Sequence, residues 1–219
     1  MATYVLIHGA GDSAFHWHLL APELREGGNE VVAMDLPCED ESAGLSEYAD
    51  AVVEAIGNRN ELILVAQSLA GFTAPLVCAR VPVRLTVLVA GMVPLPGERG
   101  DDWTANTGYP GPTVDGDEVA VFYHDVGPDI AAEAIAHARR QTDAVGRDRW
   151  PLDSWPGVPT RYLLCLNDRM FPADWMRGVV RERLGFEPDE IESGHCPALS
   201  RARELAARLD GYRIELGIA

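Results

Sequence analysis

Five continuously apolar runs recur along the chain, and segments with helical periodicity separate most of them. The runs occupy residues 3–8, 30–35, 61–66, 84–90 and 160–166, and they read TYVLIH, EVVAMD, ELILVA, RLTVLVA and TRYLLCL. Continuous apolar character, without polar alternation, is typical of strands buried on both faces. Helical patterns follow the first three runs over residues 15–28, 45–57 and 69–81. The alternation of strand and helix predicts an α/β fold with a parallel sheet and right-handed crossovers.

The regular alternation stops after the fourth run. Residues 91–118 are rich in Gly, Pro and Asp and show no periodicity, whereas residues 129–142 have the pattern of a helix. The α/β pattern resumes at residue 158. We therefore expect a core formed by residues 1–91 and 158–219, with residues 92–157 inserted as a lid or cap. Insertions between sheet strands often cover an active site.

Length and charge narrow the class of protein. A chain of 219 residues suits one domain, and a net charge of −16 argues against nucleic acids or anionic membranes as partners. No apolar run approaches the roughly 20 residues needed to span a bilayer, and the amino terminus lacks the basic region of a signal peptide. The cysteines are widely spaced and form no C-x-x-C pair. We expect a cytoplasmic protein without disulfides, either a monomer or a homodimer.

The first motif follows the first apolar run directly. Residues 9–14 read Gly-Ala-Gly-Asp-Ser-Ala, which fits G-x-G-x-x-A, and Asp35 follows about 20 residues further on. Those features are typical of a dinucleotide-binding unit, in which the acid binds a ribose. The same loop also fits an oxyanion loop, so its role depends on the remaining motifs.

Three residues follow predicted strands in the order Ser, Asp, His. Ser68 stands between the third apolar run and a helix, in the sequence AQSLAG, where small neighbours permit a sharp turn. Asp168 follows the fifth run, and His195 lies in a turn after a short strand-like stretch. Taken singly, Ser68 and Asp168 are equally well explained as helix caps or loop residues, and His195 as a solvated loop histidine. Together they fall at the carboxyl ends of strands, where open parallel sheets hold their reactive groups.

On these residues the sequence resembles the α/β-hydrolase family, and within it the small methylesterase and hydroxynitrile lyase group with its bacterial esterase-like relatives. The matching stretches cover nearly the whole chain: YVLIHGAGDSAFHWHLL, DLP, VAQSLAG, YLLCLNDRMFP and GHCPALSR. The resemblance implies about six parallel strands, with the first two strands of the family absent, helices on both faces and a lid in the insertion.

The resemblance also implies a serine hydrolase that forms an acyl-enzyme. Ser68 is then the nucleophile, His195 the base and Asp168 the acid that orients it. The backbone N–H groups of Ala10 and Leu69 are expected to form the oxyanion hole. In this interpretation His8 is structural, Asp35 does not bind a ribose, and no cofactor is required.

Departures from the family pattern bear on the reaction. Gln67 precedes the nucleophile where relatives often have His or Glu, and Gly9 stands where the lyases carry Thr. Cys196 and Pro197 follow His195 where those lyases place the Lys that stabilises cyanide, so hydrolysis is favoured over lyase chemistry. Cys196 itself is a weaker nucleophile candidate because it shares the loop of His195.

The remaining expectations concern ligands. Trp103, Tyr109, Phe122 and Tyr123 either line a pocket for a small apolar or aromatic ester or form a small core of the lid. His16 and His18 are two apart on a predicted helix and face different directions, so no metal site is expected. A binding protein with little or no catalysis on the same fold is the alternative to an esterase.

Overall fold

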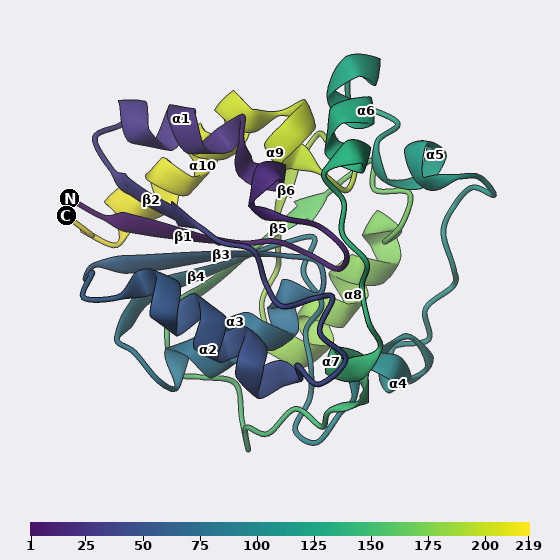
Figure 1. Cartoon of the computed structure of the whole chain (residues 1–219), viewed down its shortest axis with the longest axis horizontal. Coiled ribbons are helices and arrows are strands. Elements are labelled where there is room, and N and C mark those ends of the chain that lie inside the picture. Colours follow the sequence, from purple (N-terminus) through teal and green to yellow (C-terminus); the bar gives the residue numbers. More distant parts are fainter.

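The computed structural model describes residues 1–219, and a six-stranded sheet runs through its centre (Figure 1). All neighbouring strands are parallel, in the order β2-β1-β3-β4-β5-β6. The strands are β1 (Thr3–Ile7), β2 (Glu30–Ala33), β3 (Leu62–Gln67), β4 (Val83–Val89), β5 (Thr160–Cys165) and β6 (Asp189–Ile191). Each of the five apolar runs forms a strand, which confirms the predicted parallel α/β sheet.

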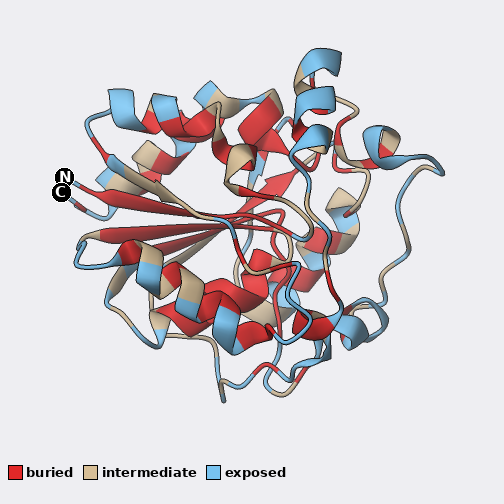
Figure 2. Cartoon of the chain, viewed as in Figure 1, coloured by how far each residue is buried: buried red, intermediate tan, exposed pale blue.

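Helices cover both faces of the sheet, as expected from the resemblance (Figure 1). One face packs against α1 (Leu20–Glu26) and α10 (Ala202–Glu215), and the other packs against α2 (Leu45–Ile56), α3 (Ala70–Cys78) and α8 (Ala173–Leu184). The central strands are therefore buried on both sides (Figure 2). None of the helices combines the length and the apolar character needed to cross a membrane.

The segment between β4 and β5 contains four short helices and no strand. They are α4 (Gly100–Asn106), α5 (Glu118–Phe122), α6 (Pro128–Ala136) and α7 (Ala144–Arg147), and they gather beyond the carboxyl ends of the strands (Figure 1). Two tryptophans of this segment belong to the core: Trp103 Nε1 donates to Val93 O at 3.0 Å, and Trp150 Nε1 donates to Phe72 O at 3.1 Å. Trp150 thus ties part of the insertion to α3 beneath it.

The strand order brings together the loop that follows β1 and the turn that follows β3. From β1 the chain crosses to β2 on one side and then returns to place β3 on the other side. The point where the crossover direction reverses leaves a crevice at the carboxyl ends of β1 and β3. Ile7 pairs with Ala66 there, so the loop that contains Ala10 begins beside the strand end that carries Ser68.

His8 links the ends of β1 and β2 at the base of that loop. The ring is buried, its Nδ1–H donates to Gly9 O at 2.8 Å, and its Nε2 accepts the N–H of Leu36 at 3.0 Å. Burial lowers the pKa of His8 below its ordinary value of 6.5. A ring nitrogen that accepts a hydrogen bond carries no proton, so the bonding pattern agrees with a neutral, structural histidine.

The turn from β3 into α3 depends on a glycine. The Ser68 carbonyl accepts hydrogen bonds from the N–H groups of Gly71 at 3.1 Å and Met92 at 2.9 Å. A Cβ atom on Gly71 would lie 1.9 Å from the carbonyl oxygen of Met92. Since that neighbour is backbone, it has no side-chain freedom with which to move away. Gly71 therefore permits the segment that follows β4 to approach α3 closely enough to hold the turn.

The neutral state of His8 predicts how stability depends on pH. Below about pH 6.5 the unfolded chain binds a proton that the folded ring resists, so the free energy of unfolding falls as pH decreases. Above that value His8 is neutral in both the folded and the unfolded chain, so it no longer lowers the free energy of unfolding. Urea unfolding at pH 7.5 and pH 5.5 measures the fall, and His8→Gln, which cannot titrate, should show a smaller one. An identical pH dependence in the two proteins would show that His8 does not contribute.

Gly71→Ala is expected to destabilise the protein by about 1–3 kcal/mol, because the added methyl group forces backbone apart in a packed region. Gly178→Ala is the matched control: Gly178 lies on α8 with open space around its Cβ position. The control should stabilise the helix by up to about 1 kcal/mol. Both changes are measured by urea unfolding, and a Gly71→Ala protein as stable as the wild type would contradict the packing argument.

Candidate active site

Ser68 sits at the sharp turn between β3 and α3 with left-handed backbone. Its φ is +53°, which is uncommon for a residue with a side chain. This conformation costs about 1–3 kcal/mol and persists only where the surrounding structure imposes it. Its N–H donates to Val89 O at 3.3 Å, and its carbonyl is held as described above. The turn has this strained form although alanines, Ala66 and Ala70, occupy both flanking positions of the elbow pattern.

Asp168 and His195 form a buried pair from two neighbouring loops. His195 Nδ1–H donates to Asp168 Oδ2 at 2.7 Å, and both side chains are almost fully buried. The other carboxylate oxygen, Oδ1, accepts the N–H groups of Met170 at 2.8 Å and Phe171 at 2.9 Å. The carboxylate is therefore fixed by its own loop. With Nδ1 donating, Nε2 of the neutral ring is free to accept a proton.

Two aromatic rings hold the imidazole edge-on. The ring centroid of Phe171 lies 5.2 Å from that of His195 at an interplanar angle of 78°, and that of Phe122 lies 5.4 Å away at 65°. Phe171 belongs to the loop of Asp168, whereas Phe122 ends α5 in the insertion. Apolar rings on two sides limit the orientations that the imidazole can adopt.

Ser68 and His195 line the same cavity, but no hydrogen bond joins their side chains in the structure. Catalytic hydrogen bonds are often long before substrate binds. A separate contact joins their segments, because Gln67 Nε2 donates to the backbone carbonyl of His195 at 3.3 Å. The sequence-predicted nucleophile, base and acid are thus brought to one edge of the sheet, with the base and the acid in direct contact.

The two backbone groups predicted for the oxyanion hole have no partner within the chain. Neither Ala10 N–H nor Leu69 N–H donates a hydrogen bond to a protein atom. Ala10 lines the cavity, and Leu69 is the residue directly after Ser68, before α3 begins. Gly9 lies tightly against the turn, since a Cβ there would be 2.4 Å from Gln67 Oε1. Unused donors beside a cavity are available to a ligand oxygen.

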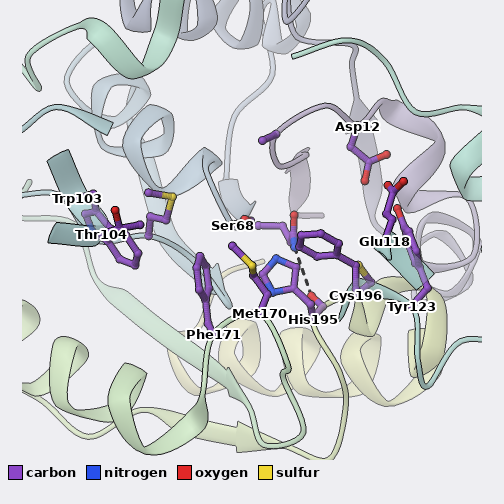
Figure 3. Close-up of a pocket in the computed structure, with 14 residues that line it drawn as sticks. Asp12, Ser68, Trp103, Thr104, Glu118, Tyr123, Met170, Phe171, His195 and Cys196 are labelled. Atoms are coloured by element: carbon purple, nitrogen blue, oxygen red, sulfur yellow. Dashed lines mark hydrogen bonds between the residues drawn. The ribbon is translucent and has the colours of Figure 1, made fainter. Parts of the chain in front are cut away.

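The cavity has a volume of about 220 Å³, and both Ser68 and His195 line it (Figure 3). Its size is at the small end for ligand pockets. The other residues that line it are Ala10, Asp12, Gln67, Met92, Trp103, Thr104, Glu118, Phe122, Tyr123, Met170, Phe171 and Cys196.

The two ends of the cavity differ in chemistry. Trp103 lies on one side of Ser68, and Asp12 and Glu118 lie on the opposite side (Figure 3). Burial tends to raise the pKa of Asp12, but the neighbouring His16, 2.7 Å away, and the N–H of Ser13 outweigh it and lower the pKa below its ordinary value. The lining contains no Lys or Arg. Sequence reasoning missed both acids, although Asp12 lies only two residues after Ala10.

Three of the four aromatic residues predicted for the pocket line the cavity, and Tyr109 does not. The Tyr109 hydroxyl donates to Met170 O at 2.5 Å, and the ring packs against Phe171 and Trp175. Tyr109 therefore lies behind the cavity wall and supports it. The sequence leaves both alternatives open for Tyr109, because the irregular segment around it has no pattern that separates residues lining a pocket from residues supporting its wall.

Other sequence candidates have structural partners. Asp35 Oδ1 accepts the N–H of Ala14 at 2.7 Å, at the start of a short 3₁₀ helix (Ala14–Trp17). Burial raises the pKa of the Cys196 thiol well above its ordinary value, which disfavours the reactive thiolate. All four cysteines are unpaired. No group of three or more His, Cys, Asp or Glu side chains is arranged to hold a metal ion.

Comparison with known proteins identifies the family. A family model described as the alpha/beta hydrolase family matches residues 4–208. The chain is 33% identical to norfluorocurarine synthase 1 of Strychnos sp, over 92% of this chain and 91% of that protein. It is 24% identical to methylesterase 7 of Arabidopsis thaliana, over 94% of each. The solved structure of polyneuridine aldehyde esterase has a TM-score of 0.80 at 19% identity, covering 97% of this chain and 99% of that one.

The structural likeness agrees with the six-stranded sheet, and the family model spans nearly all of the chain that forms it. From the family model and the relative at 33% identity, we conclude that this chain belongs to the alpha/beta hydrolase family.

Proposed function

We propose that the protein hydrolyses a small carboxylic ester with Ser68, His195 and Asp168 as its catalytic triad. The observation that carries this proposal is the buried 2.7 Å hydrogen bond between His195 and Asp168, beside a cavity that also contains the strained Ser68. The esterase names of the relatives support the reaction class. The cavity of about 220 Å³, with Trp103, Phe122 and Phe171 in its wall, favours a small apolar or aromatic substrate.

In the first half of the proposed reaction, Ser68 Oγ attacks the ester carbonyl carbon while His195 Nε2 takes the hydroxyl proton. The negative charge on the former carbonyl oxygen is stabilised by the N–H groups of Ala10 and Leu69. The tetrahedral intermediate then expels the alcohol, which takes the proton from His195. Asp168 stabilises the positively charged ring during both transfers.

In the second half, water replaces the alcohol. His195 takes a proton from the water, whose oxygen attacks the acyl carbon on Ser68. The bond between that carbon and Ser68 Oγ then breaks, Oγ takes the proton back from His195, and the acid is released. The same two N–H groups stabilise the second tetrahedral intermediate, because the oxyanion forms in the same place. The proposed partner is therefore a small-molecule substrate alone, and no step requires a metal or a redox cofactor.

Ser68→Ala tests the mechanism with p-nitrophenyl acetate at neutral pH. The wild type should show serine-dependent turnover, and the variant should lose a factor on the order of 10⁴–10⁶ in rate, because no other group supplies the acyl-accepting oxygen. Ser154→Ala, an exposed serine without hydrogen bonds, should match the wild type. Circular dichroism must show that both variants are folded.

Asp168→Asn provides a second reading of the same mechanism. It should lower the rate by about 10⁴, because the imidazole loses the acceptor that orients it and stabilises its charged form.

If Ser68→Ala keeps more than a tenth of the turnover in pure protein, the mechanism is wrong. An inert wild type that nevertheless binds a small molecule tightly would favour a binding protein on this fold.

The acidic end of the cavity predicts discrimination by substrate charge. The ester 4-acetoxybenzamide is neutral, whereas 4-acetoxybenzoate has nearly the same size and carries a carboxylate. Repulsion by Asp12 and Glu118 should lower kcat/KM for the anionic ester at least about tenfold, equivalent to about 1.4 kcal/mol. Added salt should reduce the difference by screening it. Equal kcat/KM values at low salt would show that the acids do not face the substrate.

A further inference from the structure

One pair of adjacent residues in the insertion contacts both loops that carry the proposed acid and base. Asp125 Oδ2 accepts the N–H of Gly194 at 2.7 Å, and His124 Nε2–H donates to the carbonyl of Asn167 at 3.0 Å. Gly194 directly precedes His195, and Asn167 directly precedes Asp168. The two contacts therefore act on the backbone next to each member of the buried pair.

Gly194 shows how closely this pair is seated. A Cβ atom at Gly194 would lie 2.5 Å from Asp125 Oδ1 and 2.8 Å from His124 Nε2. The backbone of Gly194 does not have the left-handed conformation that favours glycine. The absence of a side chain is therefore required by the approach of His124 and Asp125, and not by the conformation of the loop itself.

The carboxylate of Asp125 is an expensive group to place here. Its Oδ1 is buried and accepts no hydrogen bond from another group of the chain, which makes a carboxylate costly at this place. A residue chosen only for packing would avoid that cost. From the same segment, Phe122 places its ring edge-on against the imidazole of His195. Residues 122–125 thus contact His195 through its ring and through its backbone neighbour.

We propose that His124 and Asp125 are positioning residues that hold the loop of Asp168 and the loop of His195 in fixed positions relative to each other. The inference rests on the proposed catalytic function of Asp168 and His195. Neither His124 nor Asp125 lines the cavity, so they act through the loops and not on the substrate. The two loops also contact each other directly, through Asn167 N–H and Ser193 O at 2.9 Å. Clamping both from the insertion keeps His195 Nδ1 and Asp168 Oδ2 at hydrogen-bond distance.

This role predicts an effect on turnover and little effect on substrate binding. Displacement of a catalytic group by about 1 Å can lower a rate by about 10²-fold. With p-nitrophenyl acetate, Asp125→Ala should lower kcat at least about tenfold and leave KM within about twofold. Asp125→Asn should recover most of the activity, because its amide oxygen can accept the Gly194 N–H. His124→Ala should lower kcat in the same way from the other loop.

The control is Asp129→Ala, which removes an exposed carboxylate from α6 in the same insertion and should leave both constants unchanged. A second readout is the downfield proton NMR signal of His195 Nδ1–H, assigned by its loss in Asp168→Asn. It should broaden or move upfield in Asp125→Ala and His124→Ala and persist in Asp125→Asn and Asp129→Ala. Circular dichroism and thermal unfolding identify any variant that fails to fold.

Several results would overturn the proposal. One is an Asp125→Ala protein with wild-type kcat and a wild-type NMR signal. Another is a rise in the KM of Asp125→Ala in place of a fall in its kcat. A third is an equal loss of kcat in Asp125→Asn and Asp125→Ala. If Asp125→Ala does not fold, His124→Ala with unchanged kcat and signal overturns it. Failure of the proposed function is distinguishable, because it appears as turnover retained by Ser68→Ala. The NMR signal reports the contact between the loops of Asp168 and His195 in either case.

Discussion

The site depends on the left-handed backbone of Ser68. That conformation persists because neighbouring strands and the following helix impose it: Val89 accepts the Ser68 N–H, while Gly71 and Met92 donate to its carbonyl. The hydrogen bonds require Met92, just after β4, to meet α3 at Gly71, where no Cβ fits. Once the turn is held, the Ser68 side chain occupies the crevice between β1 and β3, and the neighbouring backbone N–H groups remain unbonded. The position of Ser68 at the cavity and the unbonded N–H groups beside it thus follow from one backbone constraint.

Much of the fold was predictable from the sequence because strands buried on both faces have a strong signal. Their continuous apolar runs locate five strands, and a parallel sheet brings all carboxyl ends to one edge. The sequence alone therefore groups Ser68, Asp168 and His195. The close approach at Gly71 was not predictable, because the elbow pattern places its glycines at the positions held here by Ala66 and Ala70. Contact between backbones leaves no periodicity in a sequence.

The cavity was only partly predictable for a related reason. Residues 91–118 lack periodicity, so an aromatic residue there has no assigned face; Trp103 proved to be both core and cavity wall, and Tyr109 proved to lie behind it. Nothing in the sequence assigns a role to His124, since its partner is a backbone carbonyl, which any residue could provide. Phe171 was missed although it lies three residues after Asp168, because its contact with the imidazole depends on how the loop closes around the carboxylate.

The insertion divides into parts that are held to the rest of the chain in different ways. The part near α4 is tied to the core by the buried indole of Trp103 and by the ion pair between Glu98 and Arg183, both almost fully buried. Residues 118–125 contact the rest of the chain mainly near the loops that carry Asp168 and His195. A movement that opened the cavity there would withdraw Phe122 from the imidazole and Asp125 from Gly194 together. The proposed base is therefore held through its ring and through its backbone neighbour by one short segment of the insertion.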